Sequence, residues 1–117
     1  MNAIAQKSKE FAVRIVRLSR FLQQNQKEYV LSRQLLSSGT SIGANVREAT
    51  QAFTHADFAH KMSIALKESA ETEYWLELLY ETDFLTEREF RSMYRDNQEL
   101  TRLLTAILKT ASGIRNH

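Results

Sequence analysis

Histidine and carboxylate residues at helical spacing are the first candidates for chemistry in this chain. Helix bundles that hold two iron or manganese ions use Glu-x-x-His pairs as ligands. The nearest match here is Asp57-x-x-His60, and no Glu is followed by His three residues later. Asp57 also stands three residues after Thr54, where it completes a helix-capping pattern. We therefore expect no metal site and no cofactor, and we expect His55 and His60 to lie at the surface.

The chain also lacks the residue patterns that are usual for nucleophilic catalysis and for phosphate binding. The chain has no cysteine, which removes thiolate nucleophiles, thiolate metal ligands and disulfides. A serine nucleophile needs a paired base on a strained turn, whereas the serines between positions 37 and 41 stand inside a helical pattern. Gly39 and Gly43 are not followed by the Lys of a phosphate-binding loop. We expect that the protein is not an enzyme.

Small side chains fill positions 37–45 in the middle of a helical segment. The two glycines in this run each cost about 1 kcal/mol of helix propensity. Close approach of a neighbouring helix backbone would compensate for that cost, and a ligand cleft is the alternative. Four polar residues align on one flank of the same segment, as a polar helix-packing flank that forms either a buried network or the floor of a groove: Ser38, Ser41, Asn45 and Glu48.

The segment from 55 to 82 carries a second apolar side in addition to its core stripe. Glu68 and Glu71 border this second side. Exposed aromatic and aliphatic residues of this kind are enriched in protein interfaces, and the alternative is a wider core. We expect a subunit interface at Ile64, Tyr74, Trp75 and Leu78.

A basic flank occupies the first helical segment and the turn after it. Its members are Lys7, Arg14, Arg17, Arg20 and Lys27. Charged runs on bundle helices are commonly solvated faces. The alternative is a phosphate-binding surface for RNA or DNA, which requires only cations spaced along the polyanion. No aromatic stacking platform accompanies these cations.

The hydrophobic periodicity predicts four helices in a single domain that spans residues 1–117. Apolar residues recur at three- and four-residue steps over approximately 3–24, 28–52, 55–82 and 87–112. Capping-box patterns mark two of the starts, Thr54 with Asp57 and Thr86 with Glu89. Proline is absent, and the connections are short. These features predict an all-α, antiparallel four-helix bundle with up-down-up-down topology.

Charge is distributed unevenly along the chain. Residues 1–35 carry seven Lys or Arg against two Glu, residues 36–90 carry four against ten acidic residues, and residues 91–117 carry five against two. This asymmetry favours contacts between copies of the chain or with a polyanion. The segment Met1–Glu10 is polar and resembles no export signal. We expect a cytoplasmic protein that does not associate with membranes.

Two runs of the sequence carry a resemblance to a known family. They are residues 34–49, which read QLLSSGTSIGANVREA, and residues 61–76, which read KMSIALKESAETEYWL. In these runs and over nearly its whole length, the chain resembles the bacterial "four helix bundle protein" family, also called the 23S ribosomal RNA intervening-sequence protein family. Members of that family often have Gly after the third helix, where this chain has Thr82-Asp83-Phe84.

The resemblance implies a left-handed antiparallel bundle that assembles as a homopentamer around a central channel. It also implies kinship to the accessory protein of diversity-generating retroelements, a basic pentamer that binds nucleic acid and a reverse transcriptase. Together with the residues above, it leads us to expect a homo-oligomeric scaffold or binding protein without catalytic activity. The alternative is an RNA- or DNA-binding accessory protein linked to ribosomal RNA intervening sequences or to a retroelement.

Overall fold

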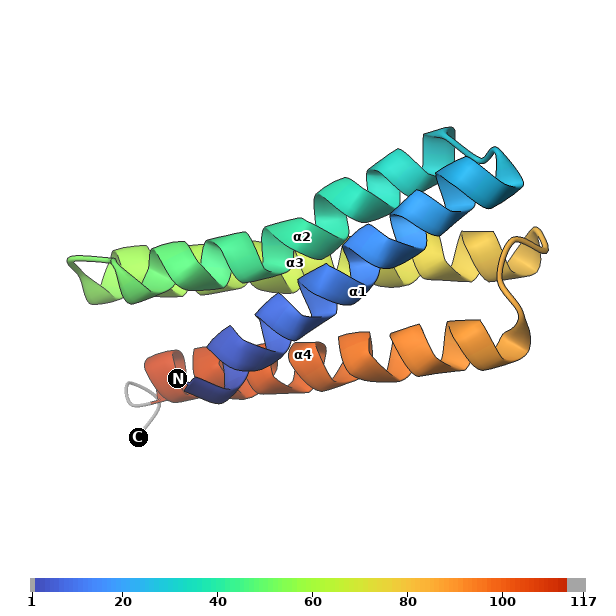
Figure 1. Cartoon of the computed structure of the whole chain (residues 1–117). Helices are drawn as coiled ribbons and strands as arrows, with labels where there is room; N and C mark the ends of the chain where they lie inside the picture. Colours follow the sequence, from blue (N-terminus) through green and yellow to red (C-terminus); the bar gives the residue numbers. More distant parts are fainter. Residues whose placement is uncertain (1, 114–117) are drawn as a thin grey trace.

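The computed structural model describes residues 2–113 of the chain, and these fold into four helices (Figure 1). The helices are α1 (Asn2–Gln26), α2 (Val30–Thr50), α3 (His55–Glu81) and α4 (Glu87–Gly113). Each observed end lies within two residues of the end that the apolar periodicity indicates. Sequential helices run antiparallel and pack against each other, which confirms the predicted all-α four-helix bundle.

The core of the bundle consists of the apolar stripes of all four helices. Ile15 of α1, Leu35 of α2, Leu76 of α3 and Leu104 of α4 are all fully buried. Full burial of one such side chain stabilises a fold by about 1.5–3 kcal/mol. The bundle is elongated, with extents of 50 × 24 × 21 Å.

Local hydrogen bonds fix the starts of α3 and α4. The Thr86 amide donates to Oε1 of Glu89 at 2.8 Å, and the Glu89 amide donates to Oγ1 of Thr86 at 3.1 Å. This is the reciprocal capping box that the sequence predicts. At α3, the Asp57 amide donates to Oγ1 of Thr54 at 3.0 Å. Both predicted helix starts are therefore confirmed.

The start of α2 uses a cap that the sequence patterns do not indicate. The two carboxylate oxygens of Glu28 accept hydrogen bonds from the amides of Leu31 and Ser32, at 3.1 and 2.7 Å. The Ser32 hydroxyl donates to the Glu28 carbonyl at 2.7 Å. A carboxylate at this position accepts hydrogen bonds from otherwise unpaired amide groups, and its negative charge is stabilised by the positive end of the helix dipole.

The end of α3 takes a turn that glycine usually occupies. Asp83 has a φ of 70°, in the left-handed region. The Phe84 amide donates to the Leu79 carbonyl at 2.8 Å, and the Asp83 amide donates to the Tyr80 carbonyl at 3.1 Å. These two hydrogen bonds form a Schellman motif around Asp83. The chain therefore makes this turn with Asp83 in place of the glycine that is common in the family. The turn keeps its hydrogen bonds, and the backbone at Asp83 is strained.

Small residues bring α1 and α2 into close contact. A Cβ atom built at Gly43 would lie 3.3 Å from the Ser8 carbonyl oxygen, and one at Gly39 would lie under 3 Å from the Ile15 side chain. The Ser19 hydroxyl donates to the Ser32 carbonyl at 3.0 Å across the same interface. These contacts support the packing interpretation of the small-residue run.

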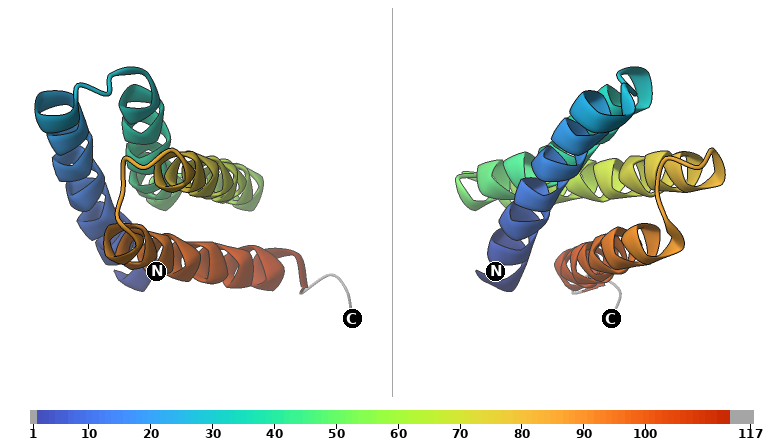
Figure 2. Two further views of the ribbon diagram at one scale, coloured as in Figure 1. Left: turned by 90° about the vertical axis from the view of Figure 1, so that its right-hand side faces the viewer. Right: turned by 45° about the vertical axis from the view of Figure 1, so that its right-hand side comes forward.

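The interface between α1 and α4 is the least extensive contact between neighbouring helices in the bundle. The two helices diverge toward the carboxyl end of α1 (Figure 2). Nζ of Lys7 lies 3.0 Å from Oε2 of Glu99, and Arg14 pairs with Asp96. Two ion pairs at the helix surfaces therefore contribute to this interface.

Candidate interaction surfaces

The apolar side of α3 lies partly in the core and partly in solvent. Trp75 is half-buried and packs against the core residues, while the neighbouring Tyr74 is 53% exposed. Their rings meet edge to face, with centroids 5.2 Å apart. Ile64 and Leu78 are half-buried. Of the four predicted interface residues, Tyr74 is thus the most accessible and Trp75 has a clear role in the fold.

Two carboxylates accompany these apolar residues. Oε1 of Glu71 accepts a hydrogen bond from Nε1 of Trp75 at 3.4 Å. Burial raises the pKa of the Glu68 carboxyl above its ordinary value, and the nearby Glu71 carboxylate adds to that increase. Among residues 2–113, neither carboxylate forms an ion pair. We call the surface formed by Ile64, Glu68, Glu71 and Leu78 the α3 outer face.

The predicted polar flank of α2 passes from the core to the surface. Ser38 is fully buried and accepts a hydrogen bond from Oγ1 of Thr72 at 2.9 Å. Ser41 and Asn45 are half-buried, and Nδ2 of Asn45 donates to the Ser41 carbonyl at 2.8 Å.

Glu48, the last member of this flank, is exposed. Its Oε1 lies 2.8 Å from Nζ of Lys61 on α3. The hydrogen bond from the Lys61 ammonium to the Glu48 carboxylate is the main reason why the pKa of Lys61 is raised above its ordinary value. The flank thus joins α2 to α3 at both its buried and its exposed end.

The five residues of the predicted basic flank do not share one surface. Lys7 and Arg14 point toward α4, where they pair with Glu99 and Asp96, and Nη2 of Arg14 also donates to Oγ of Ser92 at 2.8 Å. Nζ of the exposed Lys27 donates to the Gln24 carbonyl at 3.0 Å. Only Arg17 and Arg20 stay together as exposed cations on the outside of α1.

Arg17 and Arg20 instead share their surface with Lys9, a residue that the sequence analysis did not select. These three cations line a shallow hollow of about 380 Å³ together with Ala12, Val13 and Val16. Val13 is 41% exposed. Within the part of the chain that the structure describes, none of the three cations forms an ion pair. We call the surface formed by Lys9, Val13, Val16, Arg17 and Arg20 the α1 outer face.

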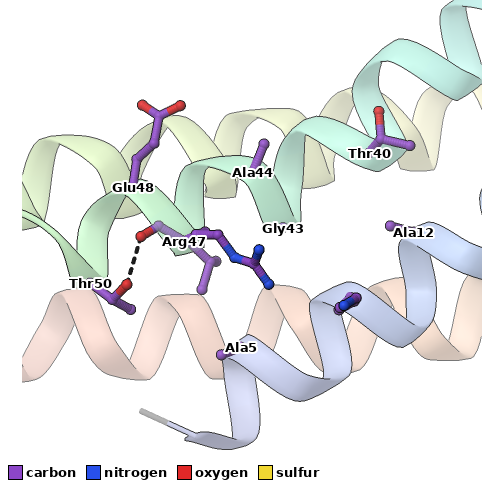
Figure 3. A pocket seen from close by; sticks show the side chains of 10 residues that line it. Ala5, Ala12, Thr40, Gly43, Ala44, Arg47, Glu48 and Thr50 are labelled. Carbon is purple, nitrogen blue, oxygen red and sulfur yellow. Dashed lines mark hydrogen bonds between the residues drawn. The ribbon is translucent and has the colours of Figure 1, made fainter.

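A larger groove of about 490 Å³ lies between α1 and α2. Figure 3 shows Ala5 and Ala12 on α1 at one side, with Gly43 and Arg47 on α2 at the other. Lys9 also lines this groove, so it connects the groove to the α1 outer face. One side of the small-residue run opens to solvent at this groove. Gly43 packs closely against Ser8 of α1 and also forms part of the wall of the groove.

The histidines and the acidic side chains do not form a metal-binding group in the described part of the chain. His55 and His60 are exposed at the start of α3. No group of three or more metal-ligating His, Cys, Asp or Glu side chains occurs among residues 2–113. No helix in the same range is long and apolar enough to cross a lipid bilayer.

The family described as 23S rRNA-intervening sequence protein matches residues 1–106. The chain is 56% identical to a protein of unknown function from the S23 ribosomal protein family of Bacteroides thetaiotaomicron VPI-5482. That match covers 91% of this chain and 98% of that chain, with a TM-score of 0.90. No curated protein matches the chain. The chain therefore belongs to the 23S rRNA-intervening sequence protein family.

Proposed function

We propose that this chain is a homo-oligomeric scaffold or binding protein without catalytic activity. The observation that carries the proposal is the α3 outer face with its neighbour Tyr74, which is 53% exposed. Ile64 and Leu78 leave further apolar surface there. Apolar surface grouped with an aromatic side chain is typical of subunit contacts.

The non-catalytic part of the proposal is supported by the roles of the polar side chains. Ser38 and Thr72 bond to each other between α2 and α3, and Ser69 bonds to Asn97 between α3 and α4. These hydroxyl groups join neighbouring helices, and among residues 2–113 their hydrogen-bond partners are hydroxyl, amide and carbonyl groups. A nucleophile would need such a base within hydrogen-bond reach.

A pentamer is the assembly that the family resemblance implies. Sedimentation equilibrium of the purified chain at micromolar concentration tests self-association, and a mass equal to the 13.6 kDa monomer would contradict the proposal. The mass of the assembly gives the number of subunits independently of its shape.

A matched pair of variants locates the contact. Leu78→Glu places a charge on the α3 outer face and should dissociate the oligomer, because an interface cannot hydrate a buried charge. Val30→Glu is the control, since Val30 is 64% exposed at the start of α2. Leu78 suits this experiment better than Trp75, because Trp75 packs against the core and its replacement would also disturb the fold.

A second candidate function is binding of RNA or DNA. The family description names a ribosomal RNA intervening sequence, and the α1 outer face offers cations without ion-pair partners among the described residues. The proposed contact residues differ from the basic flank of the sequence analysis. Lys7 and Arg14 are held by acidic residues of α4, so Lys9, Arg17 and Arg20 would meet the phosphates.

Fluorescence anisotropy with ribosomal RNA fragments and with single-stranded DNA tests this second candidate. Affinity should fall with salt, with a log-log slope of about −0.7 to −0.9 for each phosphate contact. Arg17→Gln with Arg20→Gln should weaken binding to every sequence alike. Arg95→Gln with Arg102→Gln is a matched control, because both residues are exposed on α4. Equal loss in both variants, or no binding at low salt, would contradict this candidate.

A further inference from the structure

Two surfaces of the bundle have matching apolar centres. On the α1 outer face, Val13 is 41% exposed and Val16 is half-buried. On the α3 outer face, Ile64 and Leu78 are both half-buried. Each pair removes only part of its apolar surface from water within the monomer, so each gains from a partner that covers the rest.

The charges beside these apolar centres are opposite in sign. The α1 outer face carries Lys9, Arg17 and Arg20, and the α3 outer face carries Glu68 and Glu71. Among residues 2–113, none of these five side chains has an ion-pair partner, whereas Lys7, Arg14, Lys61 and Arg91 each do. Lys67 is the one cation close enough to Glu68 to lower the pKa of its carboxyl. Docking of the two faces would therefore bring unpaired charges of opposite sign together.

The two faces also agree in length. From Lys9 to Arg20 the α1 outer face extends over about 17 Å, and from Ile64 to Leu78 the α3 outer face extends over about 21 Å, at 1.5 Å per residue. Both faces lie on regular helices, whose backbones are fixed by the core. One helix can therefore lie along the other over about three turns without rearrangement of either.

The α2 helix packs against both α1 and α3. Lys9 of the α1 outer face lines the groove with Arg47 of α2, and Lys61, three residues before Ile64 on α3, pairs with Glu48 of α2. Because the two faces are different surfaces of one chain, their contact is head-to-tail. Such contacts close into a ring when the rotation per subunit allows it.

We propose that the α1 outer face of one copy binds the α3 outer face of the next copy, with Arg17 and Arg20 opposite Glu68 and Glu71. This inference rests on the proposed function, because it names the two surfaces through which the chain self-assembles. The α2 helix then lies between the two contacts of every subunit.

Charge reversal with rescue tests the pairing by size-exclusion chromatography and light scattering at micromolar concentration. Arg17→Glu with Arg20→Glu should give a monomer, and so should Glu68→Lys with Glu71→Lys. The four substitutions in one chain restore opposite charges and should restore the oligomer. Arg95→Glu with Arg102→Glu applies the same charge change to exposed residues of α4 and should leave the mass unchanged. Circular dichroism checks that each variant is folded.

A mixing experiment covers the case in which the fourfold variant does not fold. The variant with Arg17→Glu and Arg20→Glu keeps an intact α3 outer face, and a Leu78→Glu variant keeps an intact α1 outer face. An equimolar mixture should form a 1:1 dimer and nothing larger, because each subunit has one intact face. A two-fold symmetric contact would stop at the dimer in the unaltered chain, so an unaltered assembly larger than a dimer together with this 1:1 dimer identifies a head-to-tail contact.

The outcomes separate this inference from the proposed function. A monomeric unaltered chain would overturn both. An unaltered chain that is oligomeric, together with charge-reversed α1 variants of unchanged mass, would overturn the pairing alone. Loss of RNA binding in those α1 variants without any change of mass would also overturn it, and would assign the α1 outer face to nucleic acid. Loss of assembly with rescue, or the 1:1 dimer, supports the pairing.

Discussion

Gly39 lies directly against the side chain of Ile15: a Cβ atom at Gly39 would lie 2.7 Å from Cγ1 of Ile15. Both residues are buried at the interface of α1 and α2. Nonbonded carbon atoms do not approach this closely, and optimal separations are about 3.5–4.0 Å. The spacing of these two helices therefore depends on the absence of a side chain at position 39.

Gly39→Ala should destabilise the fold. Alanine gains about 1 kcal/mol of helix propensity over glycine, but overpacking in a core costs about 1–3 kcal/mol. At 2.7 Å the steric cost should be the larger, so we expect a lower midpoint in chemical denaturation. Gly43→Ala is the comparison, because its Cβ would lie 3.3 Å from the Ser8 carbonyl oxygen, so its steric cost should be smaller than that of Gly39→Ala. Ile15→Ala removes all three Ile15 atoms that approach this Cβ, so a smaller cost of Gly39→Ala in an Ile15→Ala background would attribute the loss to this contact.

Asp83→Gly should stabilise the protein. Asp83 has a φ of 70°, where an L-residue is strained and glycine is not. We expect a gain of about 0.5–1 kcal/mol in the free energy of unfolding, measured by urea titration. A loss of stability would show that the Asp83 side chain contributes more than its backbone strain costs. Asp83→Ala separates these effects, because it removes the carboxylate and keeps the strain.

Asn97→Asp should be strongly destabilising at neutral pH. Asn97 is fully buried; its Nδ2 donates to the Ser69 carbonyl at 2.9 Å, and its Oδ1 accepts from the Ser69 hydroxyl at 3.2 Å. An aspartate carboxylate would face that carbonyl with no donor and would lose its hydration, which costs several kcal/mol. Burial favours the protonated acid, so stability relative to Asn97 should recover as the pH falls. A pH-independent loss would contradict this account.

Glu77→Gln should raise the melting temperature at neutral pH. Burial raises the pKa of the Glu77 carboxyl, and the neighbouring Glu73 and Glu81 carboxylates raise it further. A carboxyl whose pKa is higher in the folded state than in the unfolded state destabilises the fold above that pKa, and the penalty is relieved as the pH falls through it. Two like-charge pairs at four-residue spacing contribute about 0.5–1 kcal/mol in total. The benefit of Glu77→Gln should therefore fade in acid.

The sequence predicts those parts of the fold that depend on local chemistry. The capping pairs Thr54 with Asp57 and Thr86 with Glu89 are short-range, and both make the expected hydrogen bonds. The Glu28 cap was missed because glutamate is not among the residue types that usually cap a helix start. Its carboxylate nevertheless accepts hydrogen bonds from the amides of Leu31 and Ser32. A search for acidic residues just before an apolar helix would have found it.

The candidate surfaces were harder to predict because they depend on which side of a helix meets which neighbour. Lys7 and Arg14 have the same charge as Arg17, yet the first two pair with acidic residues of α4, whereas Arg17 has no ion-pair partner among residues 2–113. The sequence pattern does not distinguish Lys9, which lines the same hollow as Val13 and Val16 in the folded chain. Helical spacing gives each residue's angle around the axis, but the rotation of α1 within the bundle comes from tertiary packing.

The sparse contact between α1 and α4 gives the bundle a preferred order of opening. The Lys7 to Glu99 and Arg14 to Asp96 pairs are exposed to solvent by about two-fifths on each side, so salt screens them, whereas the buried contacts of α2 with α3 are insensitive to salt. Amide hydrogens of α1 and α4 should then exchange faster as ionic strength rises, while those of α2 and α3 keep their protection. The bundle therefore behaves as a stable α2–α3 pair from which α1 and α4 separate first.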